Sequence, residues 1–102
     1  MQISEAEFTT QVVQLAQLHG WKVVHFRAAK TGKGWRTAMQ GDPGFPDIIA
    51  ARRGRVVAAE LKVGKNQPTD CQREWLAHWG QDAYLWYPAD WAQIEHIFGG
   101  GR

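Results

Sequence analysis

The sequence predicts one mixed α/β (α+β) domain, in which a central mixed sheet is flanked by helices. Two observations lead to this expectation. Segments with apolar residues at helical spacing alternate with short runs of β-branched and aromatic residues. A length of 102 residues, with 44% hydrophobic and 22% charged residues, suits an ordinary globular chain with one core. The segments follow in the order helix, three strands, helix, strand, helix.

The first helix is expected over residues 3–19. Ser4 can cap its start, and Gly20 is a natural stop at its end. Residues 21–27 follow as a strand, because they are rich in β-formers. The apolar stripe that would face the core from the helix consists of Phe8, Val12, Leu15 and Ala16.

Residues 28–45 have no clean period and contain several glycines and cations, which predicts a mobile basic loop. A loop this long in a small domain is usually functional or disordered. Its cations suit contact with a phosphate backbone, and a plain solvated connection is the alternative. The residues expected to contact DNA are Lys30, Lys33 and Arg36 in this loop and Lys65 in a later one.

A hairpin is predicted next, with strands over 47–52 and 55–63 and a turn near Arg53-Gly54. The remaining elements are a helix capped by Thr69 or Asp70 and ending near Trp79, a strand over 83–87, and a last helix that Asp90 caps over 91–98. We expect residues 1–98 to form a single domain and 99–102 to form a flexible tail.

The candidate site lies on the two hairpin strands. Residues i and i+2 of a strand share a face, so Glu60 and Lys62 point the same way, and a facing strand can bring Asp47 beside them. Two carboxylates and an amine are costly to place beside an apolar run unless they have a task. Oxygen ligands suit a hard divalent cation such as Mg²⁺ or Mn²⁺. Taken singly, a turn aspartate and an exposed strand pair are the alternatives.

These residues resemble a known signature. Pro46-Asp47 on one strand and Glu60-Leu61-Lys62 on the next resemble the PD-(D/E)xK nuclease superfamily. The fuller string GFPDIIAARRGRVVAAELK, followed by Gln72 in an early helical turn, is similar to its VRR-NUC branch (virus-type replication-repair nucleases) over nearly the whole chain. The resemblance implies a restriction-endonuclease-like core, αβββαβ(α). It also implies a metal-dependent phosphodiesterase, an endodeoxyribonuclease. For stand-alone members it implies a homodimer that acts on branched DNA such as Holliday junctions.

The resemblance also implies roles for single residues. Asp47 and Glu60 would ligate the metal, with the backbone carbonyl of Leu61 as a further ligand. Lys62 would orient the attacking water and offset charge in the transition state. Gln72 would hold the catalytic lysine or a phosphate, and an exposed amide on the helix surface is the alternative.

The superfamily also uses an acidic residue on the first helix, for which there are two candidates. Glu5 shares the stripe of Phe8 and Val12 and is the one we choose, whereas Glu7 aligns with a polar face. Either residue could instead serve only to complement the helix dipole.

Composition narrows the function classes further. The net charge of +2 permits nucleic-acid binding without requiring it. A single cysteine excludes an internal disulfide and fits a reducing compartment. The sequence shows no membrane-spanning run, signal peptide or glycine-rich phosphate loop, so we expect a cytoplasmic protein of a bacterial or phage-infected cell, with no membrane partner and no nucleotide cofactor.

Two other function classes share these features. A nuclease-fold module that binds DNA without cleaving it would carry the same basic loop. A restriction-type or RNA-directed nuclease could use the same scaffold. Nothing in the sequence indicates base readout, so a panel of substrates is needed to separate these classes.

Overall fold

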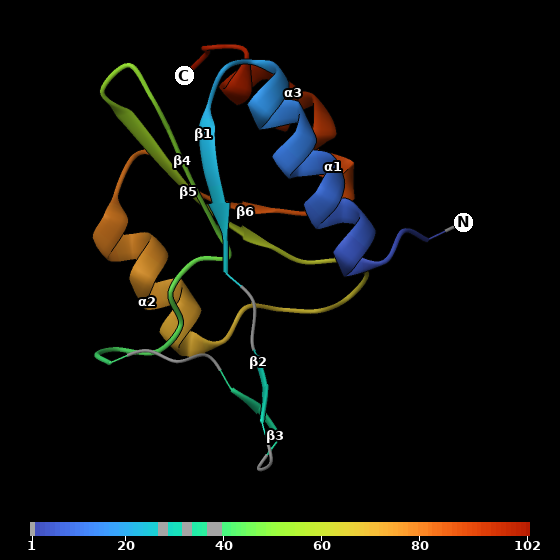
Figure 1. Cartoon of the computed structure of the whole chain (residues 1–102), viewed down its shortest axis with the longest axis vertical. Helices are drawn as coiled ribbons and strands as arrows, with labels where there is room; N and C mark the ends of the chain where they lie inside the picture. The colour runs from blue at the N-terminus through green and yellow to red at the C-terminus, as the bar shows by residue number, and fades with distance from the viewer. Residues whose placement is uncertain (1, 27–28, 32–33, 37–39) are drawn as a thin grey trace.

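The computed structural model describes the backbone of residues 2–26, 29–31, 34–36 and 40–102, and the side chains of 2–26 and 40–102. The elements in chain order are α1 (Glu5–Leu18), β1 (Lys22–His25), β2 (Ala29–Thr31), β3 (Gly34–Arg36), β4 (Ile48–Arg52), β5 (Arg55–Leu61), α2 (Asp70–Trp79), β6 (Ala83–Trp86), the 3-10 turn η1 (Pro88–Asp90) and α3 (Trp91–Phe98). Helices α1 and α3 lie on one side of the main sheet and α2 lies on the other (Figure 1).

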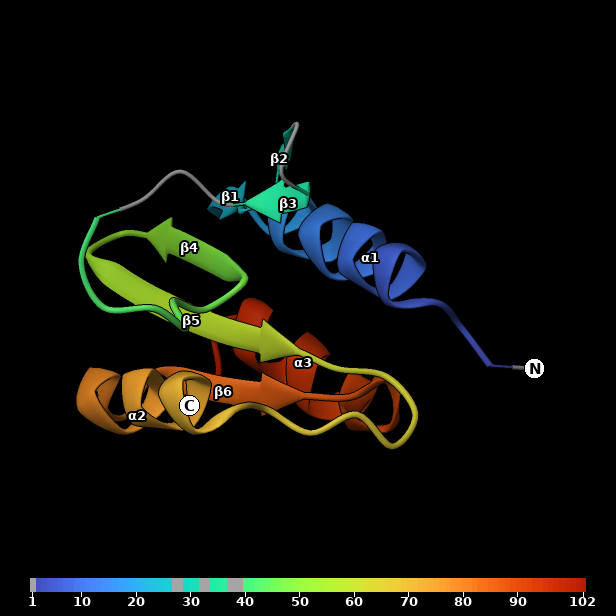
Figure 2. The ribbon, with the colours of Figure 1, turned by 90° about the horizontal axis from the view of Figure 1, so that it is seen from below.

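The main sheet has four strands in the order β1-β4-β5-β6. The β1–β4 and β4–β5 pairs are antiparallel and β5–β6 is parallel, so the sheet is mixed. Seen from below, β4 and β5 lie between α1 and α2 (Figure 2). The predicted mixed α/β architecture with helices on both faces is therefore confirmed, whereas the restriction-endonuclease-like core stays a prediction.

The prediction of an irregular loop over 28–45 was wrong for part of the backbone. Strands β2 and β3 pair antiparallel as a separate two-stranded sheet, with Ala29 opposite Arg36. Each strand has three residues, which is too few for a sequence period to reveal. Lys33 lies outside the described residues, and so do the side chains of Lys30 and Arg36.

The helix caps explain where two helices begin. The Glu7 N–H donates to Ser4 Oγ at 3.1 Å at the start of α1. Thr69 caps α2, which confirms one of the two predicted caps, Thr69 and Asp70. Asp90 is the N-cap residue of α3, as predicted, but its side chain makes no cap bond there, because its Oδ2 accepts from the Tyr87 N–H at 2.9 Å within η1.

The apolar core lies between the sheet and the pair α1 and α3. Its aromatic centre is Phe98, whose ring meets Trp21 and Trp86 edge to face with centroids 5.4 and 5.5 Å apart. Ile48 and Ala50 of β4 both contribute to it, since the side-chain period of a strand is two. The buried members are Phe8, Val12, Ala16, Trp21, Ile48, Ala50, Val57, Ala59, Leu61, Trp86, Ile94, Ile97 and Phe98.

The last residues fold back on α3. Gly100 and Gly101 donate backbone hydrogen bonds to the carbonyls of Ile97 and His96, and the Arg55 side chain donates to the Gly101 carbonyl at 2.6 Å. The residues expected to form a tail are thus hydrogen-bonded to the domain. Within the described part of the chain, no helix has the length and apolar character needed to cross a bilayer.

Candidate active site

The segment before β4 fixes the position of Asp47. Gly44 has φ +91°, and a Cβ there would lie 2.6 Å from the backbone carbonyl carbon of Cys71, so only glycine fits. The Phe45 ring packs edge to face on Trp75 of α2, with centroids 4.9 Å apart. Pro46 is fully buried. The backbone entering β4 is therefore wedged against α2, and this sets the direction in which Asp47 leaves it.

Asp47 and Glu60 face each other across neighbouring strands. Ile48 pairs with Ala59, so the next pair along the same register is Asp47 with Glu60, and both side chains lie on the face opposite the α1 and α3 core. The Leu61 N–H donates to Asp47 Oδ2 at 3.0 Å. This bond holds the Asp47 carboxylate across the end of β5.

Glu60 is a buried acid that lies beside Asp47 without a hydrogen-bond donor among the described residues. The residue is 1% exposed, and neither carboxylate oxygen has a hydrogen-bond partner among the described residues. Burial, followed by the neighbouring Asp47 charge, raises the pKa of Glu60 to about 8, and Lys62 opposes that rise. An orphaned buried carboxyl is expensive, and a bound cation would remove the cost.

Lys62 is the cation closest to this acid. Its Nζ lies 3.7 Å from Glu60 Oε1, and the side chain is 15% exposed. The predicted sharing of one face by the two residues is confirmed, because Leu61 between them is buried in the core on the other face. An ion pair this long leaves the amine free to approach a bound substrate.

The two carboxylates suit a hard divalent ion for which the protein supplies only part of the coordination sphere. Among the described residues, no group of three or more His, Cys, Asp or Glu side chains could hold a metal. Asp47 and Glu60 thus supply two carboxylates, and water or substrate oxygens would complete the coordination. Mg²⁺ is typically bound in this way, through one or two carboxylates plus substrate phosphates. The backbone carbonyl of Leu61 as a further ligand stays a prediction.

The two helix carboxylates differ in their influence on this site. Glu5, at the start of α1, is exposed, and its charge contributes to raising the pKa of Glu60, so it lies near the pair. Glu7 is exposed as well, and it is not among the causes of that pKa shift. The choice of Glu5 over Glu7 remains a prediction, with electrostatic proximity in its favour.

Gln72 takes part in a capping box. Its Oε1 accepts from the Thr69 N–H at 2.8 Å, and its own N–H donates to Thr69 Oγ1 at 3.2 Å. The amide oxygen is therefore already engaged, and only the NH₂ group is left for the predicted contact with lysine or phosphate. Lys65 is exposed on the loop after β5, and Tyr87 Oη donates to the Asn66 carbonyl at 2.6 Å on the same loop.

Phe26 is the site neighbour that sequence reasoning missed. Its backbone N–H donates to the Asp47 carbonyl at 3.0 Å, which extends the β1–β4 ladder past the end of β1. Its side chain is 44% exposed. The available signal was the alternation Lys22, Val24, Phe26, which places these three side chains on one face of the strand.

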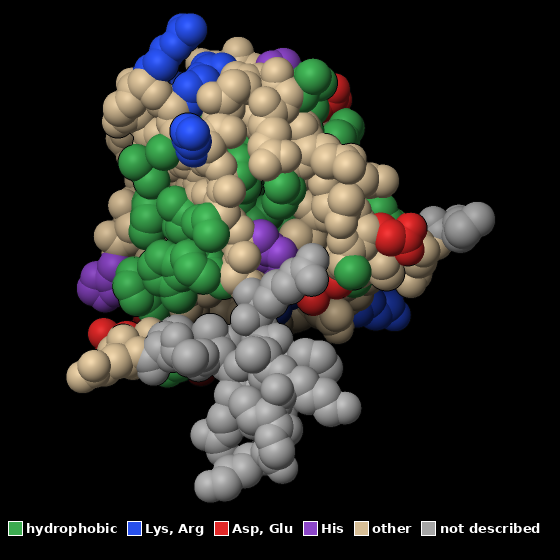
Figure 3. All heavy atoms as spheres, viewed as in Figure 1, with side chains coloured by type: hydrophobic (Ala, Val, Ile, Leu, Met, Phe, Trp, Pro, Cys, Tyr) green, Lys and Arg blue, Asp and Glu red, His purple; other side chains and the backbone are tan. Residues whose placement is uncertain are grey.

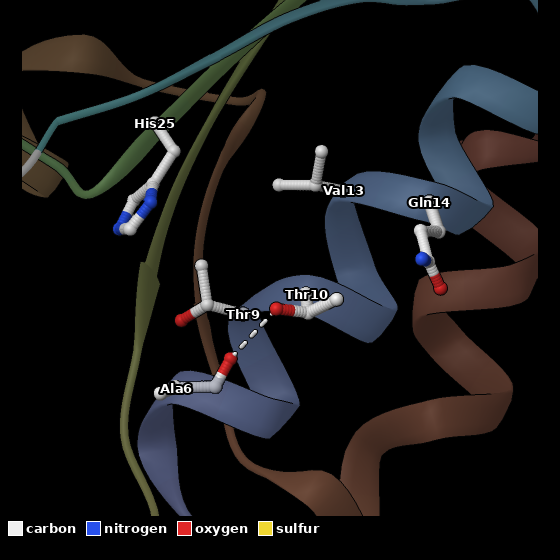
Figure 4. Close-up of a pocket in the computed structure, with 6 residues that line it drawn as sticks. All are labelled: Ala6, Thr9, Thr10, Val13, Gln14 and His25. Atoms are coloured by element: carbon white, nitrogen blue, oxygen red, sulfur yellow. Dashed lines mark hydrogen bonds between the residues drawn. The ribbon is translucent and has the colours of Figure 1, made fainter.

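A separate hollow of about 470 Å³ lies on the other face of the sheet, between α1 and the end of β1. Figure 4 shows His25 facing Thr9 of α1 across it. Thr9 and Thr10 donate their hydroxyls to carbonyls of their own helix, at 2.9 and 3.0 Å. The two threonine hydroxyls of the hollow are therefore already engaged, and its lining residues do not include Asp47 or Glu60.

Comparison of the chain with protein-family models, with curated proteins and with solved structures found no match. The functional argument therefore depends on the chain's own residues and on their arrangement.

Proposed function

We propose that this chain is a Mg²⁺- or Mn²⁺-dependent phosphodiesterase that cleaves DNA as an endonuclease, a member of the VRR-NUC branch of the PD-(D/E)xK superfamily. One observation carries the proposal. The Glu60 carboxylate is buried without a hydrogen-bond partner in the described structure, opposite Asp47 and beside Lys62. This is the set of groups, in the order along the chain, that the sequence resemblance assigns to catalysis.

Each group has a task in this proposal. Asp47 and Glu60 hold the ion, which when bound supplies Lewis-acid stabilisation of charge on the phosphate. Lys62 directs a water molecule towards the phosphorus and offsets negative charge in the transition state. A compact amine suits this task better than a guanidinium, because it approaches water closely and its pKa responds to its surroundings. Glu5 is the proposed third acid.

Branched DNA such as a Holliday junction is the proposed substrate, with a homodimer as the active form. A domain of this size covers little DNA, and symmetric cutting of two strands requires two sites related by a two-fold axis. Exposed Lys65, together with the cations of the 28–45 segment, would contact the phosphate backbone.

The decisive experiment is a Mg²⁺-dependent cleavage assay on four-way junction, flap and linear DNA. Glu60→Gln and Lys62→Ala should each lower kcat/KM by on the order of 10²- to 10³-fold, because each removes a group that stabilises the transition state. Glu95→Gln is the matched control, since it makes the same chemical change at an exposed position on α3.

Equal cleavage by the wild type and both site variants would mean that the activity comes from elsewhere. Strong DNA binding with no metal-stimulated cleavage would instead favour a binding module on the nuclease fold. A monomer in light scattering at micromolar concentration would contradict the homodimer.

A further inference from the structure

We propose that Phe26 is a stacking platform for an unpaired nucleobase next to the cleaved phosphate. The proposal rests on the proposed function and narrows its substrate. It predicts that, among branched DNAs, those with an unpaired nucleotide at the cleavage point, such as flaps, are preferred over fully paired ones such as the Holliday junction and over continuous duplex.

The position of Phe26 is the first argument. Phe26, Asp47 and Glu60 form one row across β1, β4 and β5, because the backbone pairs Phe26 with Asp47 and the register pairs Asp47 with Glu60. Neighbouring strands are about 5 Å apart, so the ring is one strand from the first carboxylate and two from the second. A phosphate held at the carboxylates would therefore leave an adjacent base within reach of this ring.

The Phe26 ring is exposed and is nevertheless held in place by other aromatic rings. Phe26 meets Phe45 edge to face, with centroids 5.3 Å apart and ring planes at 85°. Phe45 is in turn packed against Trp75 and Trp79 of α2, at 4.9 and 6.3 Å. A phenyl ring that served packing alone would gain by being buried, whereas this one keeps 44% of its surface in solvent.

The proposed ligand of the Phe26 ring is an unpaired nucleobase. Stacking of a base on an aromatic ring contributes about 1–3 kcal/mol and does not depend on base identity. Bases inside a duplex are already stacked on their neighbours, so only unpaired bases gain stacking energy from the Phe26 ring. Exposed Val24 and Val56 lie on the same face, and Figure 3 shows hydrophobic side chains gathered over β4, β5 and α2. The row with Asp47 and Glu60 favours nucleic acid at Phe26 over a protein partner.

The test compares cleavage of a flap, which has unpaired nucleotides at its branch point, with cleavage of continuous duplex. Phe26→Ala should lower kcat/KM on the flap roughly 5- to 150-fold more than it lowers kcat/KM on the duplex, the equivalent of one stacked base. Phe26→Trp should retain flap cleavage and Phe26→Leu should not. Val56→Ala is the control, since Val56 is 43% exposed on the same face but lies outside the row.

A second readout keeps this test independent of catalysis. Binding of Glu60→Gln protein should change the fluorescence of 2-aminopurine placed at the unpaired position, and binding of the Glu60→Gln, Phe26→Ala double variant should not give the same change. If the wild type does not cleave but the fluorescence change depends on Phe26, the proposed function is contradicted and the platform is retained. The platform would be overturned if Phe26→Ala lowered kcat/KM equally on flap and duplex, or if Phe26→Leu retained flap cleavage. It would also be overturned if Phe26→Ala abolished self-association and left flap cleavage unchanged.

Discussion

Strand β5 carries two charged pairs, one near each end, and they differ in almost every respect. At its start, the Arg55 guanidinium meets both carboxylate oxygens of Asp82 at 2.9 and 3.1 Å. That contact is the main cause that lowers the pKa of Asp82. Near its end, Lys62 lies 3.7 Å from Glu60, and the pKa of Glu60 is raised to about 8.

The difference separates a pair in which both partners are satisfied from a pair that, in the proposed function, binds a metal ion. A bidentate Arg–carboxylate contact satisfies both partners and fixes their geometry. Among the described residues, the Glu60 carboxylate has no such donor. In the proposed function, a bound metal ion would offset the cost of burying Glu60 without one.

The largest expected effect is the change in the free energy of unfolding with pH. The folded protein keeps a proton on Glu60 up to a pKa of about 8, whereas the unfolded chain releases it near 4.5. The folded state therefore binds more protons in this window, and the metal-free free energy of unfolding should fall as pH rises through it, by up to about 1.4 kcal/mol per pH unit. Urea unfolding across the window should show this fall for the wild type and a flatter profile for Glu60→Gln. Parallel profiles would mean that Glu60 is not held neutral.

The next effect tests the other pair. Arg55→Ala should destabilise the fold by about 3 kcal/mol, because it leaves Asp82 part-buried without its guanidinium and removes the bond to the Gly101 carbonyl. The lowered pKa of Asp82 means that the wild type keeps this contribution above pH 3.8 and loses it as pH falls through the folded-state value. Thermal unfolding measures the loss. Cleavage below the unfolding temperature should be unchanged, and a loss of catalysis there would erase the distinction between the pairs.

Metal addition should act on only one of the pairs. Mg²⁺ at 100 times its Kd should stabilise the wild type by about 2.7 kcal/mol, and should stabilise Glu60→Gln far less. Binding requires the ionised carboxylate, so the stabilisation should weaken as pH falls below the pKa of about 8. Calorimetric unfolding with and without the ion reports this directly. An equal shift in both proteins would place the ion elsewhere.

The smallest effect concerns Gln72. Gln72→Ala and Thr69→Ala each remove half of the capping box and should each cost about 1 kcal/mol of stability. If Gln72 also serves the site, only its substitution should lower kcat/KM as well. Cleavage kinetics of the two variants side by side decide this, and identical kinetics would assign Gln72 to the cap alone.

Much of the fold was readable because its signals are local. The Ser4 and Thr69 caps predicted where α1 and α2 begin, and the two apolar runs on either side of the Arg53-Gly54 turn predicted the hairpin strands β4 and β5. The period of two along a strand also predicted that Glu60 and Lys62 share one face.

The remaining features depend on contacts between distant segments. The role of Gly44 follows from the approach of Cys71 on α2, and no local pattern signals that approach. Phe26 looks like an ordinary strand residue until the register puts it beside Asp47. The burial and missing partners of Glu60, which carry the functional argument, are properties of the assembled sheet.

The close approach of Gly44 to the Cys71 backbone also provides a natural position for a fluorescent label. The chain has a single cysteine, its side chain is exposed, and its backbone touches the segment that leads into Asp47. A fluorophore attached there would occupy a single known position beside the segment that leads into the proposed site, with no engineered residue. Arrival of ion or nucleic acid could then be followed in real time on the native sequence.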